Sequence, residues 1–179
     1  IASNARLNDL ATVRAICADL RARRIAELEP ASFDLVVANP PYRALRSGRD
    51  VPERGRRLGR TETGAGLRDF VAAARRFVRN GGRVALVFTA SRSAELIATL
   101  REYRLEPKRI RFVHPRASAP AASCLIEARA DGGVEVTVEP PLWLHEGTGE
   151  YTAEARWWLG LETAPRNQAR NSDASSAMR

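Results

Sequence analysis

The sequence has little of what a disulfide framework, a metal centre or a membrane span requires. It holds only two cysteines, Cys17 and Cys124, and two histidines, His114 and His145, in 179 residues. This excludes a disulfide-stapled scaffold and argues against a metal site, because no acidic cluster stands at ligand spacing beside them. We expect both cysteines to be reduced side chains in the core. The apolar runs are far shorter than the ~20 residues of a membrane helix.

Other absences narrow the classes of function. No Gly-x-Ser-x-Gly elbow marks a hydrolase nucleophile, and no P-loop is present. No basic, apolar leader opens the chain, so we expect a cytoplasmic protein with no membrane partner. Residue 1 is isoleucine and the only methionine is Met178. We therefore expect the chain to lack an N-terminal part of a longer product.

Lysine is nearly absent although the chain is strongly basic. Lys108 is the only lysine, so arginine supplies 28 of the 29 basic residues, against 21 acidic ones, and the net charge is +8. A basic chain suits a polyanion such as RNA or DNA. The arginine excess is equally compatible with GC-rich coding, so charge alone leaves nucleic-acid binding as one of two interpretations.

Segments of strand type and helix type alternate along the chain. The strands are short and nearly continuous in apolar residues, as in parallel sheets covered on both faces, and the helices carry an apolar stripe. We expect a doubly wound α/β sheet with a late antiparallel hairpin. The expected helices are 67–78, 94–103 and the end of one over 1–10, and the expected strands are 12–18, 33–38, 83–89, 109–114, 123–130 and 134–138.

Turn residues predict where these elements end. Asn80-Gly81-Gly82 is typical of a helix C-cap, and Ser91 or Ser93 is expected as the N-cap of the next helix. Asp131-Gly132-Gly133 predicts the turn that joins the last two strands. The polar segment 161–179 is expected to be a disordered tail after a domain over 1–160.

The most informative segment is Asn39-Pro40-Pro41-Tyr42, directly after an apolar strand. The Asn39 side chain and the Pro40 carbonyl are two hydrogen-bond acceptors, and the two prolines stiffen the backbone and remove N–H donors. Such a pair can hold a planar –NH₂ group by both hydrogens, and Tyr42 offers a face on which a base can stack. The segment therefore predicts methylation of a base amino group. The plainer alternative is a Pro-Pro turn with Tyr42 packed against it.

Several segments together resemble a known family. The first of them, residues 33–42, looks like the acceptor-binding motif of S-adenosylmethionine (SAM)-dependent amino-methyltransferases, which several families share. The others point to the bacterial tRNA adenine-N6 methyltransferases, which modify an adenosine beside the anticodon of a valine tRNA. They are Arg60-Thr61-Glu62, residues 80–83, residues 107–116 with His114-Pro115-Arg116, Glu139-Pro140-Pro141-Leu142 and Gly149-Glu150-Tyr151-Thr152.

The resemblance implies a fold and a set of site residues. It implies a Rossmann-like class I methyltransferase sheet, mostly parallel with a C-terminal antiparallel hairpin, lacking the first two strands. Asn39 and the Pro40 carbonyl would bind the adenine amino group, Pro41 would complete the rigid turn, and Tyr42 would stack on the base. Asp19 and Asn39 would contact SAM. Both end expected strands and should therefore face one crevice.

The chain departs from the family's pattern at the cofactor. The family carries a glycine-rich loop after its first strand and an acidic residue for the SAM ribose after its second. This sequence has neither, because Ile1 aligns within the helix that follows that second strand. In the family's topology the two missing strands lie between the one ending at Asp19 and the one ending at Asn39, so their neighbours would lose hydrogen-bond partners. We expect the 179-residue chain alone to bind SAM poorly and to be inactive.

Other interpretations remain open. The acceptor could be an rRNA guanine, a DNA adenine or a protein glutamine, or the chain could be a non-catalytic RNA-binding remnant of the fold. The arginine-rich loop 43–60 either grips phosphates or is a solvated loop. His114 and the three tryptophans, at 143, 157 and 158, are expected to pack rather than to touch RNA.

Overall fold

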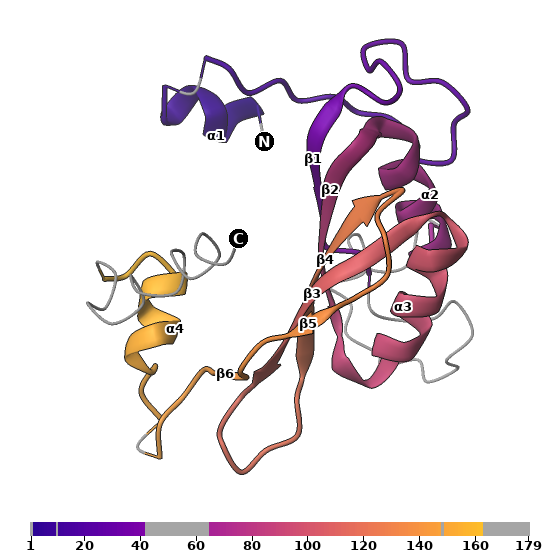
Figure 1. The fold of residues 1–179 in the computed structure, drawn as a ribbon. Coiled ribbons are helices and arrows are strands. Elements are labelled where there is room, and N and C mark those ends of the chain that lie inside the picture. The colour runs from indigo at the N-terminus through magenta and orange to yellow at the C-terminus, as the bar shows by residue number, and fades with distance from the viewer. Residues whose placement is uncertain (1, 10, 42–64, 148, 163–179) are drawn as a thin grey trace, which may run out of the picture.

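A six-stranded sheet with two helices on one face forms the body of the protein (Figure 1). The structure is a computed structural model and describes residues 2–9, 11–41, 65–147 and 149–162. Its elements are α1 (Ala2–Leu7), β1 (Phe33–Ala38), α2 (Leu67–Phe77), β2 (Val78–Thr89), the 3-10 turn η2 (Ala90–Arg92), α3 (Ser93–Glu102), β3 (Leu105–His114), β4 (Ser123–Ala130), β5 (Thr137–Val138), β6 (Leu142–Trp143) and α4 (Ala153–Trp158).

The sheet is mixed, with the strand order β1-β2-β4-β3-β5 and with β6 also paired to β3. β1 and β2 are parallel, while β4 is antiparallel to both of its neighbours, β2 and β3. The chain reaches β2 from β1 through α2 and reaches β3 from β2 through α3, which is the crossover expected of an α/β sheet. The α/β class with a late antiparallel strand is confirmed, and that strand is inserted between two parallel ones.

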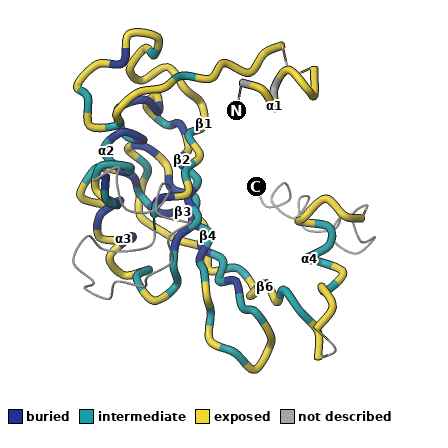
Figure 2. The backbone as a smooth tube through the Cα atoms, turned by 180° about the vertical axis from the view of Figure 1, so that it is seen from behind, coloured by how far each residue is buried: buried dark blue, intermediate teal, exposed yellow. Residues whose placement is uncertain are grey.

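The core lies between one face of the sheet and the two helices. In β2, Val84, Leu86 and Phe88 alternate with more exposed residues and are at most 2% exposed. Leu96 and Leu100 of α3 are fully buried against this face. Figure 2 shows the buried positions gathered where α2 and α3 lie against the strands, while α1 is exposed. Cys124 belongs to this core, as expected.

β1 is an edge strand and not the doubly covered strand that its apolar run predicts. Within the described residues it pairs only with β2, and Phe33, Leu35 and Val37 are 39%, 44% and 68% exposed. Leu35 and Val37 lie on the face opposite α2 and α3, where the described residues place no helix. The apolar run indicates that these positions suit burial, but burial requires a neighbouring layer.

The expected strand 12–18 does not form. Residues 11–18 run without regular structure, and Cys17 is exposed rather than in a core. The segment that follows is held at the amino end of β1, because Arg76 near the end of α2 donates to the carbonyls of Leu20 and Ala22. A strand is stable only when its backbone groups have partners, and the described residues give this segment no neighbouring strand.

The turn residues Asn80-Gly81-Gly82 lie inside a strand and do not cap a helix. α2 ends at Phe77, and β2 begins at the next residue. The β1–β2 register moves from Phe33↔Val78 to Leu35↔Arg83, so residues 79–82 bulge out of the ladder. A Cβ on Gly82 would stand 2.7 Å from Val78 Cγ2, which is why glycine is required there.

The start of α3 and the pairing of β5 also differ from expectation. The N-cap residue of α3 is Arg92 and neither of the serines, and no side chain caps that end. β5 does not pair with β4 across the Asp131-Gly132-Gly133 turn but lies parallel to β3, on the other side of it. The antiparallel hairpin is therefore formed by β3 and β4.

Three predicted segments lie outside the described residues: Tyr42, the arginine-rich loop 43–60 and nearly all of the tail 161–179.

Candidate functional site

The segment Asn39-Pro40-Pro41 leaves the carboxyl end of β1 with its asparagine at the surface. Pro40 is almost fully buried, Pro41 is half-buried and Asn39 is exposed. The buried ring of Pro40 anchors the segment against the protein body, and the two prolines restrict its backbone. The arrangement places an exposed asparagine directly before a rigid Pro-Pro segment. Tyr42, the expected stacking residue, is outside the described residues.

The carboxyl ends of β1, β2 and β3 meet at the same edge of the sheet, because these strands are mutually parallel and β4 runs against them. η2 and Arg92 follow β2 at this edge. The Arg92 guanidinium lies 5.0 Å from the centre of the Phe88 ring and donates to Glu95, and this hydrogen bond holds the pKa of that carboxyl below its usual range. The sequence offered no motif for this cation.

Residues 144–147 and 149–152 pair with each other at the same edge. The N–H groups of Leu144 and His145 donate to the carbonyls of His114 and Pro115, and the His145 ring stacks on Tyr151 at 4.6 Å. His114 Nδ1 lies 2.8 Å from the Ala119 carbonyl, which agrees with the expected packing role.

Two of the three tryptophans are not packed as predicted. Trp143 is 45% and Trp158 is 52% exposed, and only Trp157 is half-buried. Trp158 lies on α4, whose Glu154 accepts from Arg111 of β3. The apolar type of these residues predicts burial, but Trp143 lies on the two-residue strand β6 and Trp158 at the end of α4, where the described residues leave both exposed.

The structure does not bring Asp19 and Asn39 together. Asp19 precedes Leu20, whose carbonyl is bound by Arg76 at the amino end of β1, whereas Asn39 follows its carboxyl end. The Asp19 carboxylate instead accepts from the Arg21 guanidinium through both oxygens, at 3.0 and 2.7 Å. These hydrogen bonds lower the pKa of Asp19 to about 2.

We expect Arg21→Ala to return the pKa of Asp19 toward the 3.8 of an unpaired carboxyl. The lowered pKa means that the ion pair contributes stability above the unfolded value and loses it as pH falls toward 2; because the pair is exposed, the contribution is small. NMR titration of the carboxyl carbon reads this directly. Arg14→Ala is the control and should leave the midpoint in place; an unchanged midpoint in Arg21→Ala would contradict the assignment.

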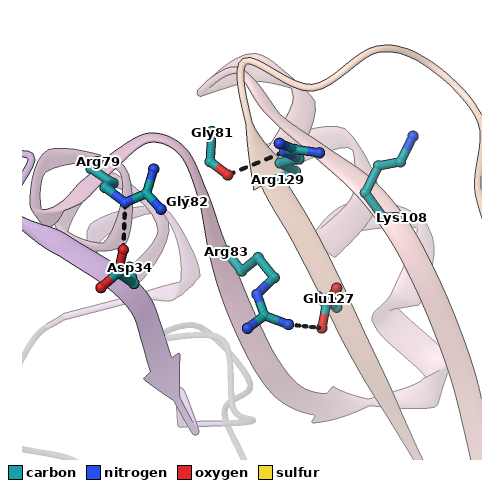
Figure 3. Close-up of a pocket in the computed structure, with 8 residues that line it drawn as sticks. All are labelled: Asp34, Arg79, Gly81, Gly82, Arg83, Lys108, Glu127 and Arg129. Atoms are coloured by element: carbon teal, nitrogen blue, oxygen red, sulfur yellow. Dashed lines mark hydrogen bonds and ion pairs between the residues drawn. The ribbon is translucent and has the colours of Figure 1, made fainter.

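A second feature, which the sequence did not reveal, is a basic groove across the amino end of β1 and β2 (Figure 3). Its volume is about 610 Å³. Arg83, Glu127 and Arg129 alternate along their strands with core residues and therefore lie on the face away from α2 and α3. The groove is lined by Asp34, Arg79, Gly81, Gly82, Arg83, Lys108, Glu127 and Arg129.

The groove is held by contacts between neighbouring strands. Arg79 donates to Asp34, and Arg129 Nε donates to the Gly81 carbonyl at 3.1 Å (Figure 3). Lys108 Nζ donates to the Gly133 carbonyl at 3.0 Å, which joins the groove to a smaller cavity of about 360 Å³ beside the turn 131–133. In the sequence, the pair Gly81-Gly82 and the single lysine, Lys108, stand out, but neither predicts that these residues meet in a groove.

Metal and membrane sites find no support in the part of the chain that the structure describes. In that part, no group of three or more His, Cys, Asp or Glu side chains is arranged to hold a metal ion. Over the same residues, no helix combines the length and apolar character needed to cross a bilayer.

Comparison with known proteins gives relatives in sequence and in structure. No family model matches the chain. It is 33% identical over 102 residues to the tRNA1(Val) (adenine(37)-N6)-methyltransferase of Parabacteroides distasonis, covering 57% of this chain and 42% of that protein. It is 30% identical over 124 residues to the protein of the same name from Porphyromonas gingivalis, covering 68% and 48%. The chain thus spans about half the length of the curated relatives it matches.

The fold has a solved counterpart. A predicted O-methyltransferase from Agrobacterium tumefaciens superposes with a TM-score of 0.68 at 24% identity, over 93% of this chain and 74% of that one. The resemblance found in the sequence is confirmed. In sequence the chain is a relative of the tRNA1(Val) (adenine(37)-N6)-methyltransferases over part of their length, and its fold is that of the class I methyltransferases.

Proposed function

We propose that the chain provides the acceptor side of a SAM-dependent methyltransferase that acts on the exocyclic amino group of adenine in tRNA. The observation that carries this is the exposed Asn39 next to the buried Pro40, at the carboxyl edge where ligands of α/β sheets bind. The names of the curated relatives support the substrate class. The net charge of +8 suits a polyanionic substrate.

The proposed role of the turn is to position a nitrogen. The Asn39 side-chain oxygen and the Pro40 carbonyl accept the two N–H groups of the amino group, so its lone pair points away from them. Neither proline has an N–H donor to compete for that position. Fixing a nucleophile in this way supplies rate by orientation, and no covalent bond to the protein is required. The adenine must leave its stack or lie in a loop to reach the turn.

The described residues do not form a cradle for SAM, which would supply an electrophilic methyl group when bound. Asp19, the side chain expected to accept from its adenine, is occupied by Arg21 and lies toward the other end of β1. The sequence also contains no G-x-G-x-x-G pattern. The proposed role of the described residues is therefore confined to binding the acceptor.

We expect titration calorimetry of SAM into the 179-residue chain to show no binding in the micromolar range. The physical reason is the missing cradle: one ion-paired carboxylate cannot hold a nucleoside against its loss of freedom. The product of the complete gene, titrated in parallel, serves as the comparison. Micromolar affinity of the 179-residue chain would show that residues outside the expected set bind the cofactor.

The acceptor is identified by incubating the complete gene product and radiolabelled SAM with total tRNA, rRNA, DNA and protein. Label in N6-methyladenosine of tRNA is the expected result. Label confined to rRNA guanine, DNA adenine or protein glutamine keeps the chemistry and changes the substrate. Each of these acceptors presents an amino or amide nitrogen that the same turn can hold.

A non-catalytic RNA-binding role is the second candidate. It is favoured by one observation: Asp19 is bound to Arg21 and kept apart from Asn39. The sequence encoded upstream of residue 1 separates the two functions. A glycine-rich strand–loop–helix there favours catalysis, and its absence together with retained RNA binding favours the binding role.

A further inference from the structure

The basic groove carries more positive than negative charge, and its carboxylates are already engaged. Four cationic side chains line it against two acidic ones. Asp34 accepts from Arg79, and Glu127 lies 3.8 Å from Arg83. In the smaller cavity Asp131 is held at 2.7 Å by both Arg75 and Arg104. The two carboxylates therefore offset Arg79 and Arg83, and the surplus charge belongs to Lys108 and Arg129, which have no carboxylate partner in the described contacts.

The groove arginines Arg83 and Arg129 retain N–H donors that can bind a ligand. A guanidinium carries five N–H groups, and the hydrogen bond from Arg129 to the Gly81 carbonyl uses the one on Nε. Arg83 is 59% exposed, and its nearest carboxylate oxygen stands at ion-pair distance rather than at the distance of a short hydrogen bond. Planar guanidinium groups with free edges are well suited to phosphate.

Two bulges shape the groove. Residues 79–82 leave the β1–β2 ladder, and Gly81 has a φ of +71°, so no side chain covers this part of the floor. In β3 the pairing passes from Pro107↔Ala128 to Arg109↔Glu127, so Lys108 is the extra residue of a second bulge. Bulges redirect side chains, and the one at Lys108 brings the single lysine of the chain to the rim of the groove.

The distance between the groove and Asn39 can be spanned by a folded RNA. Asp34 lines it near the start of β1 and Asn39 follows the end of that strand, so the two are about 16 Å apart along the chain direction. The groove itself crosses from β1 to β3, about 14 Å over three strand spacings. A mononucleotide is too short to occupy both positions, whereas a folded RNA can present a backbone to one and a loop base to the other.

We propose that this groove binds the sugar–phosphate backbone of the RNA whose base amino group is held at Asn39. The inference rests on the proposed function for its choice of RNA, and it adds that the substrate must be a structured stem-loop and not a short single strand or a free nucleoside. The groove positions the RNA without reading its sequence, because its donors are of the phosphate-binding type.

The single lysine provides a direct test. The 179-residue chain is acetylated with a limiting N-hydroxysuccinimide ester, with and without saturating tRNA, and modification of Lys108 is followed by mass spectrometry against the α-amino group of residue 1. Contact with the backbone is expected to slow acetylation of Lys108 at least about fivefold. Inorganic phosphate and adenosine monophosphate should leave its rate unchanged.

A matched pair of variants measures the contribution to affinity. Arg83→Ala removes an exposed groove arginine that faces Glu127, and Arg101→Ala removes an equally exposed arginine of α3 that faces Glu106. Arg83→Ala is expected to weaken tRNA binding about 5- to 10-fold at 0.1 M salt and to lower the salt slope by about 0.9. Arg101→Ala should change neither. Thermal melting checks that both variants fold.

The outcomes separate this inference from the proposed function. If tRNA binds but leaves Lys108 reactive and Arg83→Ala without effect, the groove is not the backbone site, and the role of Asn39 stands or falls on the acceptor assay. If polyglutamate of equal charge protects Lys108 as well as tRNA does, the groove takes an acidic protein, and the inference is wrong. If Lys108 is protected while the complete gene product methylates no RNA, the groove stands and the catalytic proposal fails.

Discussion

Asn39→Ala in the complete gene product is expected to reduce methyl transfer about 100-fold or more while the affinity for SAM changes little. The side chain is exposed at the end of β1, so its removal leaves no hole in the core. What it removes is one of two acceptors that hold the amino group, and loss of orientation at a reacting nitrogen costs rate rather than cofactor binding. Single-turnover kinetics with tRNA and calorimetry with SAM give the two numbers.

The matched control is Asn8→Ala, an exposed asparagine just after α1 whose side chain bonds the Asn4 carbonyl. It should leave both the rate and the affinity unchanged. Asn39→Asp keeps an oxygen acceptor and should lose less rate than Asn39→Ala. An equal fall in rate and SAM affinity in Asn39→Ala would argue that the residue holds the turn together and does not hold the substrate.

Phe88→Ala is expected to lower the free energy of unfolding by about 3–5 kcal/mol. The ring is fully buried in the core at the carboxyl end of β2. Its removal leaves a cavity and also takes away the surface over which the Arg92 guanidinium lies. A domain is commonly stable by only about 5–15 kcal/mol, so the variant should melt far below the parent and its carboxyl edge should loosen. Urea unfolding followed by circular dichroism measures the change.

Phe33→Ala makes the same substitution on a ring that is 39% exposed on β1 and meets Phe77 edge-on at 6.4 Å. Less area returns to water there, so we expect less than half of the loss seen for Phe88→Ala. Equal losses in the two variants would mean that β1 carries more of the stability than its exposure indicates.

Local pattern was sufficient for much of the fold. The strand predicted over 123–130 is β4 with its observed bounds, and the apolar stripe from Leu67 onward predicts α2 to within a residue. Both elements bury one face against the same core, so pattern and environment agree. The strand expected over 12–18 failed because a strand depends on partners, which periodicity cannot supply.

Turn chemistry was less reliable than periodicity. Asn80-Gly81-Gly82 fits a helix C-cap, yet these residues form a bulge in β2 because Gly82 must pass within van der Waals contact of Val78 and the Asp34 carbonyl. The same holds for Asp131-Gly132-Gly133, where β5 passes beyond β4 to the free side of β3. Glycine marks a close approach or an unusual φ, but the element it serves is decided by tertiary contacts.

In the candidate site too, the sequence predicts features that are local in the chain and misses those that depend on tertiary contacts. Asn39 and Pro40 are adjacent in the chain, so their proximity follows from the motif itself. The partnership of Asp19 with Asn39 depended on two strands ending at one edge, and it failed with the missing strand. The sequence does not predict the groove, because its cations come from β2, β3 and β4, far apart in sequence, and only the register of the strands brings them together.

The open flank of β1 has a consequence for handling the protein. Leu35 and Val37 project from a strand whose outer backbone groups have no ladder partner in the described residues, and neither a proline nor a lysine interrupts that strand. Natural sheets protect such flanks because a second molecule can add its own strand there. Concentrated samples of this chain will therefore tend to associate flank to flank, and a charged residue introduced at Val37 is the simplest means of keeping them monomeric.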